Sequence, residues 1–374
     1  MSLPRDIEGV RLLAEKLAQQ HAAAGGKIVG YVTPCVPAEL IEAAGMRPMM
    51  LSGGREMSTE RGDRVMEDLF DRSLRAVFER LLKGEFDYLS AIVLPRANDS
   101  AHRMYYYLSE LKRLGEAKLP PVLLCDVVMT PDHASRRYSI DALERLWGQL
   151  REIGDSSASP ADILGSMAIW NAHVAPIDSI LRNRHAAMGD APSGAEMLSI
   201  FAAVRMLPDQ ALIDVTRQYR LFHHQVEMVH PRVIICGSAQ HDAGLHRLVE
   251  EAGGVVVGDY HASGELGVHP MYNLRERRPP LEMLADMLRG QRAASRRTVE
   301  AGRDIREFAT LCRADLAIFS YFSEEEALTW DYPEQKAALE EIGVRVLRLP
   351  DQAWPFDVEA HREAVTAFSR GAGS

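Results

Sequence analysis

The sequence predicts an α/β protein with two parallel-sheet halves bridged by a helical segment, and two observations support this fold class. First, short apolar runs without polar alternation recur between stretches of helical spacing, and such runs are typical of strands buried on both faces of a parallel sheet. Second, this alternation stops between Ile140 and His230 and then resumes. We expect an N-terminal α/β domain at 1–155, a helical bridging segment at 156–230 and a C-terminal α/β domain at 231–374.

The N-terminal half shows the alternation four times. A helix is expected at 5–24, where apolar residues recur at helical spacing until Gly25 and Gly26 end it. Further helices are expected at 38–44, 64–83 and after Ser100. Strands are expected at four short apolar runs, 28–32, 49–51, 91–94 and 122–124.

The clearest unit opens the C-terminal half. The apolar run 233–236 ends at Gly237 and Ser238, helical spacing follows, and a second apolar run occupies 255–257. A right-handed crossover places the ends of both strands on one edge of the sheet, where open α/β sheets bind ligands. We expect Gly237 and Ser238 to contribute to a substrate site, although a glycine and a serine at a strand end most often form only a turn.

The rest of the C-terminal half continues the pattern. A basic helical region is expected at 270–306, a buried strand at 316–320, a helix at 333–342, a strand at 344–349 and a closing helix at 358–368. Each half is therefore predicted to have a Rossmann or flavodoxin-like arrangement.

Bulk composition excludes several classes of protein. Hydrophobic residues make up 47% and charged residues 26% of the chain, which is ordinary for a globular protein. No segment approaches the roughly 20 apolar residues of a membrane span, and no signal peptide is evident, so we expect a cytoplasmic protein without a membrane partner. The net charge of −10 argues against nucleic acid as a partner.

Familiar phosphate, hydrolase and zinc motifs do not occur. The chain has no G-x-G-x-x-G after its first strand, no P-loop, no G-x-S-x-G and no C-x-x-C pair. Cys35 lies between Pro34 and Pro37 in a loop after the first strand, which makes it a candidate to line a site. The other cysteines lie in or beside apolar runs and are expected to be buried.

Polar residues follow each buried strand. If the two halves face each other, the loops that carry these residues converge on one cleft. The residues in question are Cys35 and Glu39, Asn98 and Asp99, Ser238 and His241, Asp259 and His261, and Ser323 with Glu324.

These loops also carry a resemblance that covers essentially the whole chain. The sequence resembles the subunits of 2-hydroxyacyl-CoA dehydratases and ATP-dependent benzoyl-CoA reductases, of the dehydratase D-component or benzoyl-CoA reductase C type. The matching segments are GYVTPCVPAELIEAAGMRPMMLSGG at 30–54, RGD at 61–63, KGEFDYLSAIVLP at 83–95, the CGS and VEEAGG signals within 234–254, and ADLAIFSYFS at 314–323.

The resemblance implies a [4Fe-4S] cluster held by three cysteines per subunit, and here the chain departs from the family. Asp71, Asn98 and Ser323 stand at the three cysteine positions. Oxygen and amide donors are a poor substitute for thiolates, so we expect no standard cluster in this chain. Cys35 is one possible compensating ligand.

The resemblance also implies the reaction and the partners. The family uses a low-potential electron, supplied by an ATP-dependent activator, to act on an acyl-CoA. The family's P-x-E glutamate matches Glu39, a candidate catalytic residue, although a carboxylate at a helix start is also favoured by the helix dipole. His241 and His261 are the other catalytic candidates because of their positions after strands.

Three functions remain open on the sequence. The first is an acyl-CoA dehydratase or reductase subunit paired with a homologous, cluster-bearing subunit. The second is a cluster-free scaffold or acyl-CoA-binding protein. The third is a lyase or hydrolase that uses the cleft to hold a hard or borderline metal. The ligands considered for the third are Asp71, Asn98, His241, His261 and Ser323.

Overall fold

The structure is a computed structural model of the 374-residue chain. It describes residues 4, 6–54, 59–67, 69–186, 191–209, 211–213, 230–295, 300–352 and 356–371. Parts of the expected bridging segment, at 187–190, 210 and 214–229, lie outside the described residues. The predicted domain boundaries remain a prediction.

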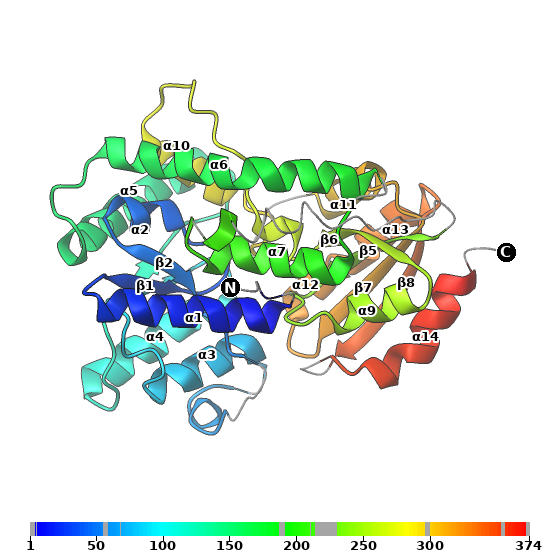
Figure 1. The fold of residues 1–374 in the computed structure, drawn as a ribbon, viewed down its shortest axis with the longest axis horizontal. Coiled ribbons are helices and arrows are strands. Elements are labelled where there is room, and N and C mark those ends of the chain that lie inside the picture. Colours follow the sequence, from blue (N-terminus) through cyan, green and yellow to red (C-terminus); the bar gives the residue numbers. More distant parts are fainter. Residues whose placement is uncertain are drawn as a thin grey trace.

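Two four-stranded parallel sheets form the centres of the two halves (Figure 1). The first contains β1 (Ile28–Tyr31), β2 (Arg47–Met50), β3 (Ala91–Pro95) and β4 (Val122–Cys125), in the order β2-β1-β3-β4. The second contains β5 (Arg232–Gly237), β6 (Val255–Tyr260), β7 (Leu316–Phe322) and β8 (Arg345–Gln352), in the order β6-β5-β7-β8. Both sheets therefore have the same topology, and the predicted fold class is confirmed.

Helices cover both faces of the first sheet, which explains its apolar strands. Val29 and Val93 belong to a core beneath α2 (Ala38–Ala43) and α5 (His133–Ile153). Their strand neighbours Ile28, Ile92 and Leu94 belong to a second core. That core lies beneath α3 (Arg72–Leu82) and α4 (Asp99–Leu114). Because successive strand residues point to opposite faces, a sheet covered on both sides needs apolar residues throughout.

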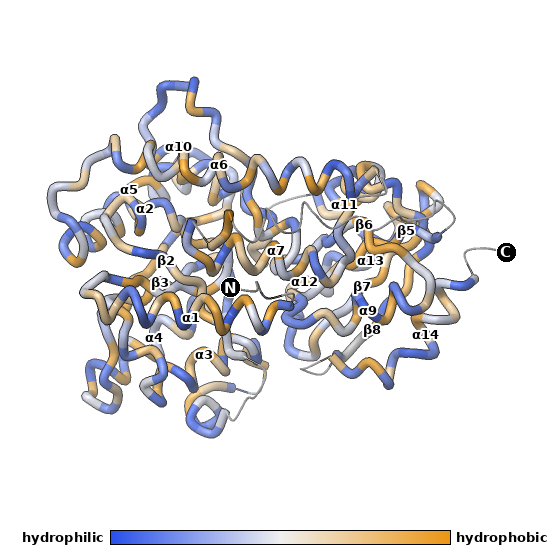
Figure 2. Tube along the Cα trace, viewed as in Figure 1, coloured by the Kyte–Doolittle hydropathy of each residue, from blue (hydrophilic) through white to orange (hydrophobic). Residues whose placement is uncertain are grey.

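The second sheet is enclosed in the same way. One face packs on α9 (Gly244–Glu251) and α14 (Val358–Arg370), and the other on α11 (Ala301–Leu311) and α13 (Tyr332–Glu340). The short helices η2 (Glu265–Gly267) and α12 (Glu326–Thr329) follow β6 and β7. Figure 2 shows the hydrophobic residues on the strands of this sheet, whereas many peripheral loops are hydrophilic.

Three helices connect the halves (Figure 1). The long α6 (Pro160–His185) packs on α2 in one half and on β6 in the other. In the same way α7 (Gly194–Met206) contacts α1 (Ile7–Ala23) and β2 as well as α9 and β6. The chain also returns after β6, because α10 (Pro280–Arg289) packs on α5 and α6 and places Met283 and Leu284 in the N-terminal core. No helix among the described residues is long and apolar enough to cross a bilayer.

One predicted helix begins later than expected. The apolar spacing from residue 64 suggested a continuous helix to 83, but α3 begins at Arg72 and a 3-10 turn, η1 (Gly62–Arg64), precedes it. The physical reason is an N-cap: the Asp71 carboxylate accepts a hydrogen bond from the amide of Leu74 at 3.0 Å.

The turn after β5 depends on a glycine. Gly237 has φ +104°, and a Cβ atom there would lie 2.4 Å from the carbonyl oxygen of Ser320 on β7. Gly253 has φ +88° with open space around the same position. We expect Gly253→Ala to cost about 1–2 kcal/mol in the free energy of unfolding. We expect Gly237→Ala to cost at least about 3 kcal/mol, because a clash with backbone adds to the strain. Urea denaturation measures both, and equal losses would contradict the role of the close approach.

Candidate functional site

A cleft lies where the strand ends of the two halves meet. In the first sheet β1 connects to β2 on one side, whereas β3 connects to β4 on the other side. The second sheet has the same arrangement, with β5 and β7 at its centre. The gaps between β1 and β3 and between β5 and β7 are therefore topological switch points. The cavity in this cleft has a volume of about 150 Å³. Its walls include a residue at or after the end of each of the four central strands: Cys35, Asn98, Gly237 and Glu325.

Most of the predicted site residues line this cleft. Those that do are Cys35, Asp71, Asn98, Gly237, His241 and His261. Ser238 lines an adjoining cavity that shares Asp71, Asn98 and His241 with the cleft. Neither Glu39 nor Ser323 lines either cavity.

The side chains at the family's cluster positions have structural partners. Asp71 caps α3, and its Oδ1 also accepts a hydrogen bond from the Ser73 hydroxyl at 2.7 Å. Asn98 caps α4 through a 3.0 Å bond from the amide of Ala101 to its Oδ1. The exposed Ser323 hydroxyl donates to Glu324 at 3.0 Å. These hard oxygen donors do not suit an iron–sulfur cluster.

Cys35 lies in an environment that favours the protonated thiol. It is buried, and burial raises the pKa of its thiol to about 12. A thiol must lose its proton to bind a metal or cluster, so this environment opposes ligation. The other three cysteines, Cys125, Cys236 and Cys312, are buried in the hydrophobic cores, as predicted.

His241 presents a neutral imidazole to the cleft. Burial lowers the pKa of His241 to about 4, even though the neighbouring Asp71 carboxylate acts in the opposite direction. Its ring stacks on Phe322, with centroids 6.2 Å apart. His241 therefore links the loop after β5 to the end of β7 and to the cap of α3.

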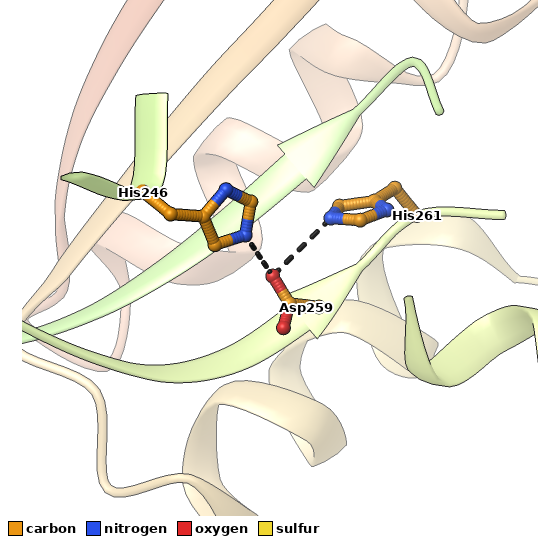
Figure 3. Close-up of side chains that lie close together, drawn as sticks. All are labelled: His246, Asp259 and His261. Atoms are coloured by element: carbon orange, nitrogen blue, oxygen red, sulfur yellow. Dashed lines mark hydrogen bonds and ion pairs between the residues drawn. The ribbon is translucent and has the colours of Figure 1, made fainter. Parts of the chain in front are cut away.

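His261, the other predicted histidine, belongs to a buried group with Asp259 and His246 (Figure 3). Oδ1 of Asp259 lies 2.6 Å from Nε2 of His246 and 3.2 Å from Nε2 of His261. Asp259 was noted as a strand-end residue, but its role as the centre of this group was not predicted. His246 was missed because its position on the apolar face of α9 gives no signal for a polar partner.

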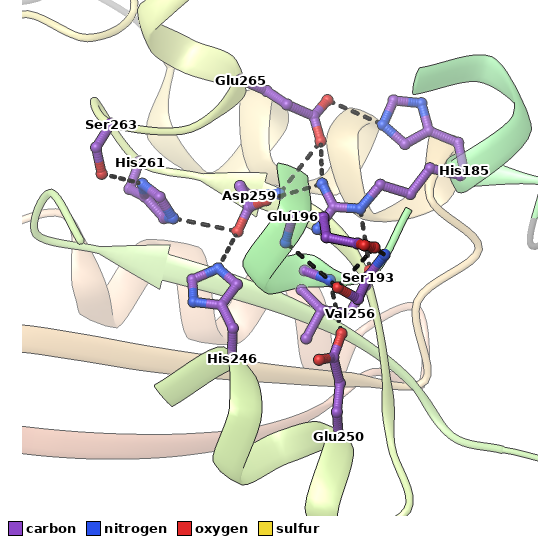
Figure 4. Close-up of polar contacts among 12 residues, drawn as sticks. His185, Ser193, Glu196, His246, Glu250, Val256, Asp259, His261, Ser263 and Glu265 are labelled. Carbon is purple, nitrogen blue, oxygen red and sulfur yellow. Dashed lines mark hydrogen bonds and ion pairs between the residues drawn. The ribbon is translucent and has the colours of Figure 1, made fainter. Parts of the chain in front are cut away.

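The group extends into a larger network beneath the cleft (Figure 4). Nη1 of Arg184 lies 2.8 Å from Oδ2 of Asp259 and 3.4 Å from Oε1 of Glu265, and His185 contacts the other Glu265 oxygen at 2.9 Å. Arg184 is 1% exposed and Asp259 is 0% exposed. Burial alone raises the pKa of Asp259, but Arg184 and His246 outweigh it, and the pKa lies well below its usual range.

His246, Asp259 and His261 are the one group of three among the described His, Cys, Asp and Glu residues whose ligand atoms lie close enough to hold a metal. Two features oppose a metal there. The Arg184 cation already pairs with Asp259, and a second buried cation would be repelled. Both histidines also direct Nε2 at the same carboxylate oxygen, which suits hydrogen bonding. Asp71 and His241, considered as metal ligands from the sequence, are not in the group.

Arg205 lines the cleft, although the sequence did not indicate it. It lies on α7, is 7% exposed and donates from Nη2 to the carbonyl of Ser263 at 2.6 Å. Its Nε and Nη1 atoms have no hydrogen-bond partner among the described residues. Burial lowers the pKa of Arg205 to about 10, so it remains a cation at neutral pH.

Glu39 lies in a different cavity, between α2 and α6. Its Oε1 accepts a hydrogen bond from the Tyr272 hydroxyl at 2.8 Å and lies 3.0 Å from Nε2 of His269, on which Trp170 stacks. Burial raises the pKa of Glu39, but His269 and Tyr272 outweigh it and the net pKa is lowered. A carboxylate held in its ionised form is poorly suited to donate a proton.

The ion pair of Arg184 and Asp259 should be essential for stability. Asp259→Asn leaves a buried cation without its partner, so we expect a loss of about 3–5 kcal/mol in the free energy of unfolding. Asp178→Asn breaks the exposed pair of Asp178 with Arg182 and should cost less than about 1 kcal/mol. Chemical denaturation at pH 7 measures both, and similar losses would contradict the argument.

The pH dependence of the Asp259 contribution follows from its lowered pKa. The stabilisation is fully present above the unfolded pKa of about 3.9 and is lost as the pH falls through the folded value. The difference between wild type and Asp259→Asn should therefore be constant from pH 5 to 8 and shrink only in strong acid.

Glu42, in the same cavity as Glu39, should have the opposite pH dependence. Burial, with smaller contributions from Glu39 and Asp209, raises its pKa to about 8. Between about pH 4.3 and 8 the folded chain keeps a proton that the unfolded chain releases, so wild-type stability falls as the pH rises. Glu42→Gln cannot ionise and should gain about 2 kcal/mol or more on wild type between pH 5 and 8. A pH-independent difference in denaturation would contradict this.

One protein-family model matches this chain. Among curated proteins, no sequence matches this chain. The model of the family described as 2-hydroxyglutaryl-CoA dehydratase, D-component, matches residues 34–369, which include the whole second sheet and β2, β3 and β4 of the first. The resemblance inferred from the sequence is thereby confirmed, and the chain belongs to the 2-hydroxyglutaryl-CoA dehydratase D-component family.

Proposed function

We propose that the chain is a subunit of a 2-hydroxyacyl-CoA dehydratase or benzoyl-CoA reductase-like enzyme and that a homologous subunit supplies the [4Fe-4S] cluster. The observation that carries this proposal is that no cysteine stands at the three positions that the resemblance assigns to cluster ligands. Asp71 and Asn98 use their side-chain oxygens to cap α3 and α4, and Ser323 is exposed and bonded to Glu324. The partner, with an ATP-dependent activator, then provides the low-potential electron, and the enzyme is cytoplasmic.

The cleft supports the acyl-CoA part of the proposal. Its walls are largely apolar, with a few polar groups at the strand ends, which is the usual composition of a small-molecule site. The apolar side chains include Met50, Leu51, Leu198, Ala202 and Leu266. Arg205 adds a buried cation that suits an anionic or strongly polarised oxygen of the ligand.

A cluster-free acyl-CoA-binding protein is the second candidate, because Asp71, Asn98 and Ser323 provide no thiolate for a cluster. The two candidates differ in their partner. The subunit should co-purify with a cysteine-bearing homologue at a fixed ratio, whereas the binding protein should remain alone and still bind acyl-CoA. Co-expression followed by size-exclusion chromatography separates them.

Restoring the thiolates tests the ligand argument directly. We expect wild-type protein, expressed alone and purified without oxygen, to contain far less than one four-iron cluster per chain. The triple variant Asp71→Cys, Asn98→Cys, Ser323→Cys should acquire iron and acid-labile sulfide. The double variant that keeps Ser323 is the matched control and should acquire less. A full complement of iron in the wild type would overturn the proposal that a partner supplies the cluster.

A further inference from the structure

A serine, a histidine and an aspartate form a continuous hydrogen-bonded chain at the wall of the cleft. We propose that this cleft hydrolyses thioesters, with Ser263 as the nucleophile, His261 as the general base and Asp259 as the residue that positions the base. The choice of a thioester rests on the proposed acyl-CoA ligand. The chain of hydrogen bonds does not depend on it.

The geometry meets the requirements of an activated serine. The Ser263 hydroxyl lies 3.0 Å from Nδ1 of His261, and Nε2 of the same ring lies 3.2 Å from Oδ1 of Asp259. An ionised aspartate only accepts hydrogen bonds, so Nε2 carries the proton and Nδ1 offers its lone pair. The Ser263 hydroxyl therefore donates to Nδ1, which is the arrangement that nucleophilic catalysis needs.

The fold holds these groups in place. Asp259 lies near the end of β6 and His261 is the first residue after the strand, and their side chains lie 3.2 Å apart. Gly264 then lets the loop fold back, since a Cβ atom there would lie 2.4 Å from Cβ of Asp259 and 2.9 Å from Cε1 of His261. His261 is 1% exposed, whereas the half-buried Ser263 lines the cleft.

Arg205 supplies a cation beside the nucleophile. Its Nη2 donates to the carbonyl of Ser263, and its Nε and Nη1 have hydrogen atoms to offer. A buried cation that needs no rearrangement stabilises the negative charge that develops on a carbonyl oxygen under attack. Ser238 has no comparable surroundings, because its Oγ accepts a hydrogen bond from the amide of Phe322.

The proposed reaction balances without a redox partner. Oγ of Ser263 bonds to the thioester carbon while its proton moves to Nδ1 of His261, and the C–S bond breaks to release the coenzyme A thiolate. That thiolate takes the proton from His261; a thiol with a pKa of about 8–9 is a good leaving group. Water, deprotonated by Nδ1 of His261, then attacks the acyl carbon, and the same proton returns to Oγ of Ser263 as the acyl–serine C–O bond breaks. The products are a carboxylic acid and coenzyme A.

The experiment measures coenzyme A release from benzoyl-CoA and 2-hydroxyglutaryl-CoA by the purified full chain, in air and without ATP or partner. We expect Ser263→Ala to lower the rate at least about a hundredfold. Ser166→Ala, which removes a buried hydroxyl from α6, should leave the rate unchanged. The rate should fall in acid as His261 is protonated, at a pH below about 6.5, because burial lowers the pKa of that imidazole.

Covalent labelling of the wild-type protein tests the nucleophile without any variant that could fold poorly. A fluorophosphonate should modify wild-type protein at Ser263, as located by mass spectrometry, and benzoyl-CoA should protect the site. Equal coenzyme A release by wild type and folded Ser263→Ala, or no label at Ser263, would overturn the proposal.

Equilibrium dialysis with benzoyl-CoA separates this proposal from the function proposed above. Binding of benzoyl-CoA without hydrolysis overturns the hydrolytic activity alone and leaves the proposed subunit function in place. Hydrolysis of p-nitrophenyl acetate that requires Ser263, without any acyl-CoA binding, would overturn the acyl-CoA function but support the nucleophile.

Discussion

The buried carboxylate of Asp259 is the interaction on which the cleft depends. It joins three elements, because Arg184 comes from α6, His246 from α9 and His261 from the loop after β6. A lone carboxylate without access to water would be strongly unfavourable. With a guanidinium on one oxygen and two imidazoles on the other, the charge is compensated. The same compensation orients His261 toward the cleft.

The second constraint is the shared topology of the two sheets. Each switch point brings two strand ends together, and the helices α6 and α7 pack on both halves so that the two switch points face one cleft. In this arrangement the residues Cys35, Asn98 and His241 become neighbours although more than 200 positions separate the first from the last.

Two of the three positions that the resemblance assigns to cluster cysteines carry helix caps in this chain. Cysteine, aspartate and asparagine all fit at the start of a helix, but aspartate and asparagine are the better caps. In this chain the carboxylate of Asp71 caps α3 and the amide oxygen of Asn98 caps α4. What remains at the wall is a set of hard donors, a neutral histidine at 241 and the Ser263–His261–Asp259 chain.

The sequence alone determined the fold class, because strands buried on both faces must be apolar throughout and such runs are visible without a structure. The sequence also predicted most of the residues that line the cleft, because the ends of parallel strands meet on one edge of a sheet. Only the tertiary structure decided which polar residues meet. Glu39 shares the first strand's loop region with Cys35 but points into another cavity, where His269 and Tyr272 hold it. Arg184 and Arg205 lie on helices whose apolar spacing gives no hint of a buried charge, and their partners come from distant segments. Contacts between residues so far apart in the sequence depend on how the two halves pack against each other, and no local sequence pattern predicts this packing.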